Sequence, residues 1–152
     1  MRYVRETYPQ IEKDYIQTGQ LRYAIFDLPL ESIHSLAFRA AVATRCAGEQ
    51  GKFWEMRNRL FANPQTLGDT VAHGQAVGLN QAKFYVCLGE TRFPDEIRKD
   101  MELAASAGVR GTPSFMLATV EANGQLKVRR VMEGAPPYAS FKTAIDALLA
   151  GR

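Results

Sequence analysis

Two cysteines, Cys46 and Cys87, are the residues of this chain best suited to redox or metal chemistry. They lie 41 residues apart and form no Cys-x-x-Cys pair, the spacing typical of a local redox couple or a zinc knuckle. Each falls within a segment of helical periodicity, beside apolar positions, which favours burial over an exposed thiol of low pKa. The residues alone leave two alternatives open: two small buried side chains, or a disulfide.

The two histidines, His34 and His73, could in principle complete a zinc site with the cysteines. No pair of these four residues has the short spacing that such sites generally use, so we expect no metal. His34 is expected to begin a helix, and His73 to lie on a solvated helix face. The sequence has no phosphate-binding glycine loop, no nucleophile elbow and no pair of catalytic carboxylates, so no cofactor is expected either.

Composition and charge narrow the classes of partner. The chain has 152 residues, of which 46% are hydrophobic and 23% charged, as expected for one folded domain. Its net charge is +3 and the basic residues are scattered, so we expect no nucleic-acid binding. No apolar run approaches the roughly 20 residues that span a bilayer, and the first residues lack the apolar core of a signal peptide. The chain as written is therefore expected to stay in the cytoplasm.

Apolar periodicity indicates the elements that position these residues. An amphipathic helix is expected over residues 3–17, kinked at Pro9 and without a capping residue before it. A strand with at least one buried face is expected over residues 21–28, where apolar residues alternate. Five helices should follow, at residues 34–47, 52–62, 70–77, 80–88 and 94–108.

The helix at 52–62 places four apolar side chains, those of Phe53, Trp54, Leu60 and Phe61, on one face that we expect to be buried. After the helices, two strands at 114–119 and 126–132 should form a hairpin around Asn123-Gly124. A last amphipathic helix covers residues 138–149. The fold class is therefore α/β, with an all-helical insertion at about residues 34–108.

This order of elements is similar to the thioredoxin motif with a helical insertion, and several strings resemble the DsbA-like thiol:disulfide oxidoreductases. The strings are Val4-Arg5-Glu6 with Tyr8-Pro9, Asp27-Leu28-Pro29-Leu30 with His34, Ala47-Gly48-Glu49-Gln50-Gly51-Lys52-Phe53-Trp54 with Leu60-Phe61, Gly78-Leu79, Phe84, Cys87-Leu88, and Gly108-Val109-Arg110-Gly111-Thr112-Pro113-Ser114-Phe115. Each is weak alone, but in this order they span nearly the whole chain and are specific.

The resemblance gives Thr112 and Pro113 a function. A proline just before a strand cannot donate to the ladder, and the residues alone favour an ordinary trans proline that opens an edge strand. In the family this element is a cis-proline loop that faces the catalytic cysteines and pairs with substrate polypeptide. The resemblance also implies a structural disulfide between Cys46 and Cys87 in an oxidising compartment, across the helical insertion.

The catalytic Cys-x-x-Cys of the family is not in this sequence. The resemblance places it at the start of the first helix, just before residues 2–5, preceded by a strand. There the helix amino terminus lowers the pKa of the attacking thiol. We therefore expect residues 1–152 to form a single incomplete thioredoxin-like domain, without the first strand and the start of the first helix, and without catalytic residues.

Two hypotheses for function follow. The first is a protein of the DsbA-like family whose disulfide chemistry is lost or is supplied by a part not present in this sequence, with polypeptide segments or a redox partner protein as its expected partners. The second is a non-catalytic module that binds polypeptide segments through the Thr112-Pro113 loop and open strand edges. The missing strand should leave two edges unpaired, which predicts a homo-oligomer or a domain swap. The family resemblance implies an extracytoplasmic location.

Overall fold

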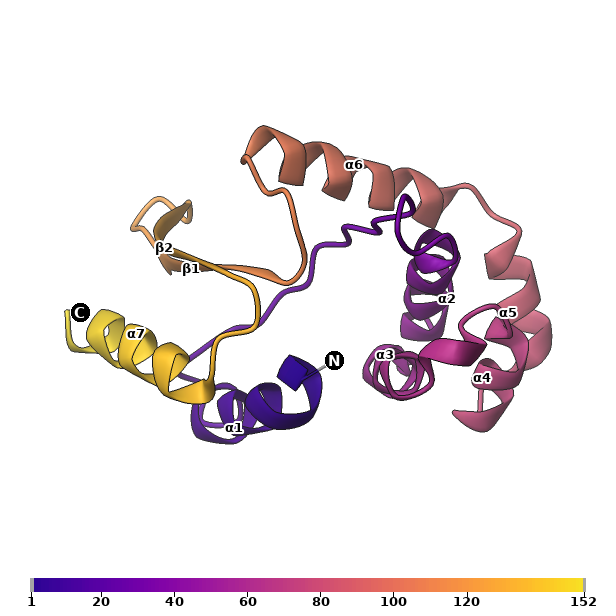
Figure 1. Ribbon diagram of the computed structural model, residues 1–152, viewed down its shortest axis with the longest axis horizontal. Coiled ribbons are helices and arrows are strands. Elements are labelled where there is room, and N and C mark those ends of the chain that lie inside the picture. The colour runs from indigo at the N-terminus through magenta and orange to yellow at the C-terminus, as the bar shows by residue number, and fades with distance from the viewer. Residues whose placement is uncertain (1, 152) are drawn as a thin grey trace. The chain divides into compact units, whose positions relative to one another are not determined.

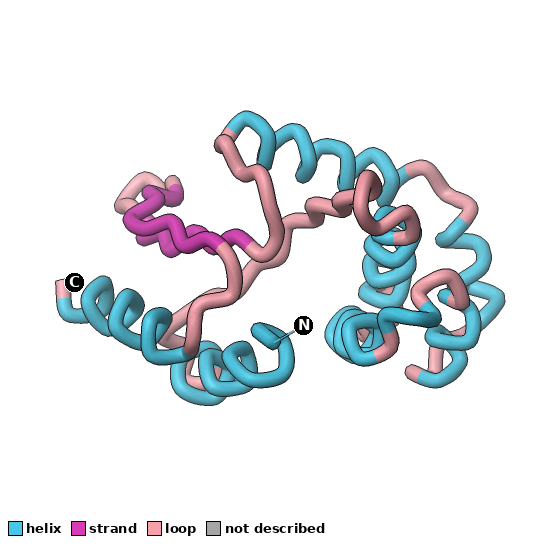
Figure 2. Tube along the Cα trace, in the orientation of Figure 1, coloured by secondary structure: helices cyan, strands magenta, loops and turns pink. Residues whose placement is uncertain are grey.

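The structure is a computed structural model that describes residues 2–151. These residues contain seven α-helices and one two-stranded antiparallel sheet (Figures 1 and 2). The chain divides into two compact units. The first, here called the sheet unit, combines the residues up to Ile25 with those from Gly111 onward; the second, the helical unit, is Phe26–Arg110. Within residues 2–151, no helix has both the length and the apolar character needed to cross a membrane.

The sheet unit begins with a helical stretch around Pro9. It consists of a π-helical turn at Tyr3–Thr7, α1 at Tyr8–Ile11 and a second π-helical turn at Glu12–Ile16. Pro9 has no N–H to donate and its ring crowds the preceding turn, which accounts for the wide turn at Tyr3–Thr7 in place of a regular α-helix. The unit ends with α7, Tyr138–Ala150.

A β-hairpin lies between these helices in the sequence. It pairs β1, Ser114–Val120, with β2, Leu126–Glu133, as expected. Gly124 in the connecting turn has a positive φ of 80°, which glycine adopts without strain. The register shifts by one residue, because Leu117 pairs with Arg130 while Ala118 pairs with Val128. Arg129 is therefore the extra residue of a β-bulge.

The core of the sheet unit joins both helical segments to one face of the hairpin. Its buried members are Tyr3, Val4, Tyr8, Ile11, Tyr15, Met132, Phe141, Ala144 and Ile145. Phe115 and Leu117 of β1 pack against this cluster. Tyr15 is buried and its hydroxyl donates to Asp146 of α7 at 2.6 Å, so a polar contact also links the two helical segments.

The strand expected over residues 21–28 is wrong, because the structure has no strand there (Figure 2). The predicted alternation is nevertheless present, since Leu21, Tyr23 and Ile25 are less exposed than the residues between them. Leu21 and Tyr23 also pack against the core of the sheet unit. A strand needs a hydrogen-bonded neighbour, and the only two strands in the described residues pair with each other.

The helical unit contains five α-helices. They are α2 at Ala37–Gly48, α3 at Phe53–Ala62, α4 at Thr70–Ala76, α5 at Gln81–Leu88 and α6 at Arg92–Ser106, with a 3₁₀ turn at Pro64–Thr66. The expected start of α2 at His34 is wrong by three residues. Turns hold residues 31–36 instead, where the amide of His34 donates to the carbonyl of Leu30. Asn80 caps α5, and its side chain accepts from the amide of Lys83 at 3.0 Å.

The core of the helical unit is formed by side chains from α2, α3, α5 and α6 and from Leu79. Its buried members are Val42, Ala43, Cys46, Ala47, Met56, Leu60, Leu79, Phe84, Cys87, Phe93 and Ile97. Two expected core residues of α3 are wrong, because Trp54 and Phe61 are each more than a third exposed. The buried Arg57 lies over both rings, 5.5 Å and 5.3 Å from their centroids. The apolar rings thus cover its guanidinium and remain partly at the surface.

Arg45 of α2 ties the start of the helical unit to α6. Its guanidinium donates to Asp27 at 2.7 Å and to Asp100 at 2.6 Å, and Asp100 also accepts from the amide of Asp27. Glu96 lies 3.8 Å from the same guanidinium. Burial raises the pKa of the Asp27 carboxyl although Arg45 donates to it. Nothing in the spacing of these residues indicates the cluster, because its members lie in three separate segments.

Candidate functional site

Thr112 and Pro113 lie at the entrance to β1. The peptide bond between them is cis, as the family resemblance implied. Thr112 is exposed, and the hydroxyl of Ser114 donates to the carbonyl of Gly111 at 2.7 Å, closing the turn. The loop therefore presents Thr112 at the surface, two residues before Ser114, the first paired residue of the sheet.

An aromatic cluster holds the residue that follows this loop in β1, Phe115, in place. The ring of Phe115 lies 4.5 Å from that of Tyr3 and 4.9 Å, edge to face, from that of Phe141. Tyr3 and Phe141 are both buried. Such contacts add to apolar burial, so the position of the loop depends on both helical segments of the sheet unit.

The two edges of the hairpin differ in charge. β1 contains no charged residue, whereas β2 contains Lys127, Arg129, Arg130 and Glu133. Beyond its pairing with β2, no strand of residues 2–151 pairs with β1. Charged side chains commonly protect an exposed strand edge from unwanted pairing, and β1 lacks this protection.

A small hollow lies beside β1 within the sheet unit. Residues 20 and 21 border it on one side, Leu117, Ala118 and Thr119 on another, and α7 completes the lining. Its volume of about 20 Å³ is enough for about one water molecule. The hollow therefore holds no ligand side chain, and a polypeptide at β1 would have to lie along the strand edge nearer to Thr112.

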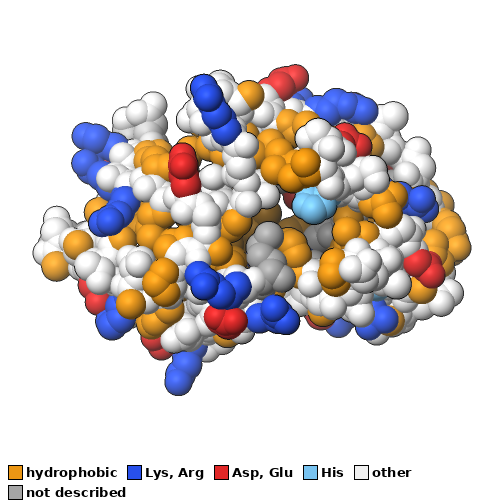
Figure 3. Space-filling view, in the orientation of Figure 1, with side chains coloured by type: hydrophobic (Ala, Val, Ile, Leu, Met, Phe, Trp, Pro, Cys, Tyr) orange, Lys and Arg blue, Asp and Glu red, His pale blue; other side chains and the backbone are white. Residues whose placement is uncertain are grey.

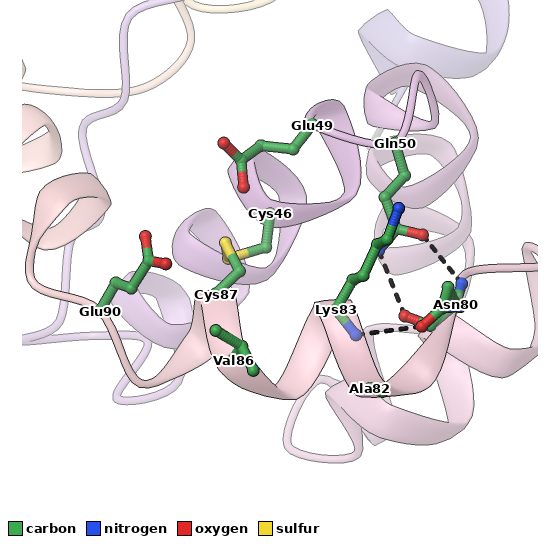
Figure 4. Close-up of a pocket in the computed structure, with 9 residues that line it drawn as sticks. All are labelled: Cys46, Glu49, Gln50, Asn80, Ala82, Lys83, Val86, Cys87 and Glu90. Atoms are coloured by element: carbon green, nitrogen blue, oxygen red, sulfur yellow. Dashed lines mark hydrogen bonds between the residues drawn. A yellow bond between two sulfur atoms is a disulfide. The ribbon is translucent and has the colours of Figure 1, made fainter.

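The two cysteines form a second, separate feature in the helical unit (Figure 4). Cys46 and Cys87 are joined by a disulfide with an S–S distance of 2.02 Å, connecting α2 to α5. Both are buried, as expected, and residues 2–151 contain no free cysteine. Because a thiolate is required to attack a disulfide, this bond provides no nucleophile for exchange while it is intact.

Polar contacts reinforce the same junction. The side chain of Gln50 both donates to the carbonyl and accepts from the amide of Asn80, at 3.3 Å and 2.8 Å. Glu49 forms an ion pair with Arg92. A shallow surface hollow of about 650 Å³ lies beside the disulfide, and its other lining residues are Ala82, Lys83, Val86 and Glu90. The disulfide and these polar contacts together hold the end of α2 against α5.

The histidines are not placed for metal binding. His34 is exposed, and no group of three His, Cys, Asp or Glu residues within 2–151 could hold an ion. The expected solvated position of His73 is wrong, because this side chain is buried and its Nε2 lies 2.9 Å from the carbonyl of Thr66. Its helix, α4, packs this side chain toward the core of the helical unit, and no pattern around His73 in the sequence indicates that burial.

Charged side chains are mixed in sign over the surface. On the face shown in Figure 3, lysines and arginines are interspersed with acidic residues and with hydrophobic side chains. Several form local ion pairs, such as Arg98 with Asp95 at 2.8 Å and Lys142 with Asp146 at 2.7 Å. The expectation that the chain binds no nucleic acid stays a prediction.

Comparison with known proteins decides the family. A family model described as thioredoxin matches residues 2–147, almost the whole chain. The chain belongs to the thioredoxin family. Its fold is DsbA-like, since its structure matches that of Wolbachia pipientis alpha-DsbA1 with a TM-score of 0.77 at 22% identity, over 98% of this chain and 78% of that one. A variant of alpha-DsbA1 with two cysteines replaced by alanine matches with a TM-score of 0.79 at 20% identity, over the same shares.

Curated relatives of this thioredoxin-family chain are much longer proteins. It is 31% identical over 117 residues to Na(+)/H(+) antiporter NhaA 3 of Salinispora tropica. The aligned region covers 76% of this chain and 18% of that protein. Na(+)/H(+) antiporter NhaA 1 of Salinispora arenicola gives the same identity and shares. The chain thus spans less than a fifth of the length of these relatives.

Proposed function

We propose that this DsbA-like chain binds extended polypeptide segments at Thr112-Pro113 and along β1, and that its own cysteines carry out no thiol–disulfide exchange. Two observations carry the proposal, one on the loop and one on the cysteines. The exposed loop opens an uncharged strand in the sheet unit, while both cysteines are held in one buried disulfide of the helical unit.

The chemistry of strand addition supports the first half of the proposal. An extended peptide gains main-chain hydrogen bonds when it pairs with a strand that has a vacant edge. β1 offers such an edge next to an exposed Thr112, and its beginning is anchored by Phe115 between two buried rings. A preorganised edge lowers the entropic cost of binding, because less of the protein has to become ordered.

The second half follows from the sulfur chemistry. Exchange begins with attack by a thiolate, and the Cys-x-x-Cys turn that supplies it in the family is not among these 152 residues. On this proposal residues 1–152 form one thioredoxin-like domain, and the helices between about residues 34 and 108 are an insertion in it. The 152 residues contain neither the first strand of that domain nor the start of its first helix. A redox partner would be needed for oxidation of a bound polypeptide.

Cation antiport, which the names of the curated relatives state, is not proposed for this chain. The match covers 18% of the two Salinispora proteins, so it concerns one region of them. The experiment below tests what this chain itself binds.

The test combines a binding and a turnover measurement on the full chain. Alkylated insulin B chain, labelled with a fluorophore, serves as an unfolded polypeptide without thiols, and its anisotropy reports binding. We expect Thr112→Asp to weaken binding, because a charge at the loop would be desolvated by the peptide. The matched control is Thr91→Asp, at another exposed threonine, in the helical unit. Equal binding by both variants and the unsubstituted chain would contradict the proposal.

The turnover arm uses reduction of insulin by dithiothreitol. We expect no acceleration by the chain above the uncatalysed rate, either with Cys46 and Cys87 or with both replaced by alanine. Acceleration that depends on the cysteines would assign them a redox role. Acceleration that survives their replacement would place the chemistry elsewhere, and either result would overturn the second half of the proposal.

A further inference from the structure

The β-hairpin has one face that the helices of the sheet unit do not cover. Phe115, Leu117 and Met132 point toward the core cluster of the sheet unit. Because side chains alternate along a strand, their neighbours point the other way. This second face, here called the outer face, is made of three cross-strand pairs: Met116 with Val131, Ala118 with Val128, and Val120 with Leu126.

The outer face is apolar and exposed over its whole length. Its five large side chains have exposed fractions between 42% and 70%. Together they present roughly 500 Å² of contiguous apolar surface, the size of the largest patch on a typical soluble monomer, and such patches are often functional. Leaving them in water forgoes the hydrophobic stabilisation that burial would provide.

The bulge at Arg129 creates this composition. If the register continued from the pair Leu117 and Arg130 without an extra residue, Arg129 would pair with Ala118, and Lys127 would pair with Val120. The outer face would then carry two cations near the turn. With the bulge, Val128 and Leu126 occupy those positions instead.

The side chain of Arg129 is held off the outer face. Its guanidinium donates to the hydroxyl of Thr119 at 2.9 Å and to the carboxylate of Glu121 at 2.8 Å. Thr119 belongs to the opposite face of β1, two residues from Leu117. The extra residue in β2 thus removes two cationic side chains from the outer face and places two apolar side chains there. A face in contact with water would be expected to carry polar side chains instead.

We propose that the outer face is the interface of a homodimer, in which two hairpins pack face to face about a two-fold axis. Two copies would bury roughly 1,000 Å² through these side chains, the lower limit for a specific protein interface. Around a two-fold axis each residue meets the same patch of the other copy, so a like charge there would repel itself. The three pairs contain no charged residue.

The proposal is independent of polypeptide binding, which uses the edge of β1 and Thr112. It is tested by sedimentation velocity of the full chain from about 1 to about 200 μM, the range over which a micromolar dimer dissociates. We expect a monomer–dimer equilibrium. Val128→Asp and Val131→Asp should each weaken it by about tenfold or more, because burial would leave an unpaired carboxylate.

The control is Val86→Asp on α5, an exposed valine outside the outer face, with an exposed fraction of 67% against 49% for Val128 and 53% for Val131. This variant should dimerise like the unsubstituted chain, and far-ultraviolet circular dichroism should show that all three variants remain folded. A monomer throughout the concentration range would overturn the proposal. So would a dimer that Val128→Asp and Val131→Asp leave unchanged, since its interface would lie elsewhere.

A second measurement locates the interface directly. The native cysteines of residues 2–151 are both in the disulfide, so a spin label reacts with an introduced cysteine alone. In Val128→Cys the label should lose mobility when the protein concentration favours the dimer. In Lys127→Cys, whose side chain alternates to the other face, it should not. Equal mobility changes at both positions would contradict face-to-face packing.

Discussion

Cys46 of α2 and Cys87 of α5 are joined by a disulfide, and their Cα atoms lie 5.8 Å apart although 41 residues separate them in the sequence. The closed loop contains α3 and α4 entirely. The bond therefore constrains most of the small core that these helices share. In the unfolded chain it removes conformational freedom that folding would otherwise have to overcome.

Replacing both cysteines with alanine should lower the free energy of unfolding of the helical unit by about 4 kcal/mol, the loop-entropy value for a loop of this length. Denaturation by guanidinium, followed by the fluorescence of Trp54, measures this, because the only tryptophan lies in α3. A reductant should reduce the stability of the unsubstituted chain and leave the double variant unaffected. A loss below about 1 kcal/mol would show that the loop constraint is unimportant.

Arg45→Met should lower the free energy of unfolding by about 3 kcal/mol at pH 7, because it leaves two partly buried carboxylates, those of Asp27 and Asp100, without their shared cation. The matched control is Arg98→Met, which removes an exposed ion pair with Asp95 and should cost less than about 1 kcal/mol.

The loss caused by Arg45→Met should shrink as the pH falls. Burial already raises the pKa of Asp27 above 3.8, its ordinary value, while the hydrogen bond and charge of Arg45 lower it; without Arg45 the folded variant therefore binds this proton more tightly than the folded unsubstituted chain does. The charged form therefore costs stability above the folded pKa, and the cost disappears as the pH falls through that pKa toward 3.8. Unfolding measured at pH 7, 5 and 4 tests this. A loss that grows toward acid would contradict the burial of Asp27.

Asn80→Ala should destabilise the helical unit by about 1 kcal/mol, since the side chain of Asn80 accepts a hydrogen bond from the amide of Lys83 at the start of α5. The bonds from Gln50 go to the backbone of Asn80 and should persist. Thr91→Ala is the control, because Thr91 precedes α6 without a side-chain capping bond. Equal losses in thermal denaturation would mean that the cap contributes nothing specific.

Gly74→Ala should destabilise by about 1–2 kcal/mol, although alanine normally favours a helix. A Cβ atom at Gly74 would lie 3.0 Å from Cε1 of Phe84 and 3.3 Å from Cδ1 of Leu79, both buried in the core of the helical unit. At Gly48 the nearest atom is the Cβ of Phe53 at 3.5 Å, an ordinary contact, so Gly48→Ala should be neutral or slightly stabilising. Comparison of the denaturation midpoints of the two variants tests whether the close approach of Phe84 and Leu79 to Gly74 excludes a larger side chain there.

Short-range patterns in the sequence were sufficient to locate most elements. The helix expected at 52–62 is α3 at Phe53–Ala62, and the helix expected at 80–88 is α5 at Gln81–Leu88. The hairpin around Asn123-Gly124 also follows from residues close together in the chain. Periodicity, capping and turn formation depend on neighbours within a few residues, so the sequence displays them directly.

Only the tertiary structure decided features that depend on distant partners. Residues 21–26 alternate in burial as expected, yet they form no strand, because a strand exists only with a neighbouring ladder. His73 is buried by the packing of α4, and Arg45 is placed by carboxylates 18 and 55 residues away.

The bulge at Arg129 is the clearest case. The residue types alone predict a simple alternation in β2, but the pairing with β1 adds one residue and reverses which side chains face outward. The sequence by itself determined the kinds of elements, the resemblance to DsbA-like proteins and the lack of a Cys-x-x-Cys. Which faces are buried, and which are left exposed, was settled by long-range pairing and packing, because burial is a property of contacts between segments and not of any one segment.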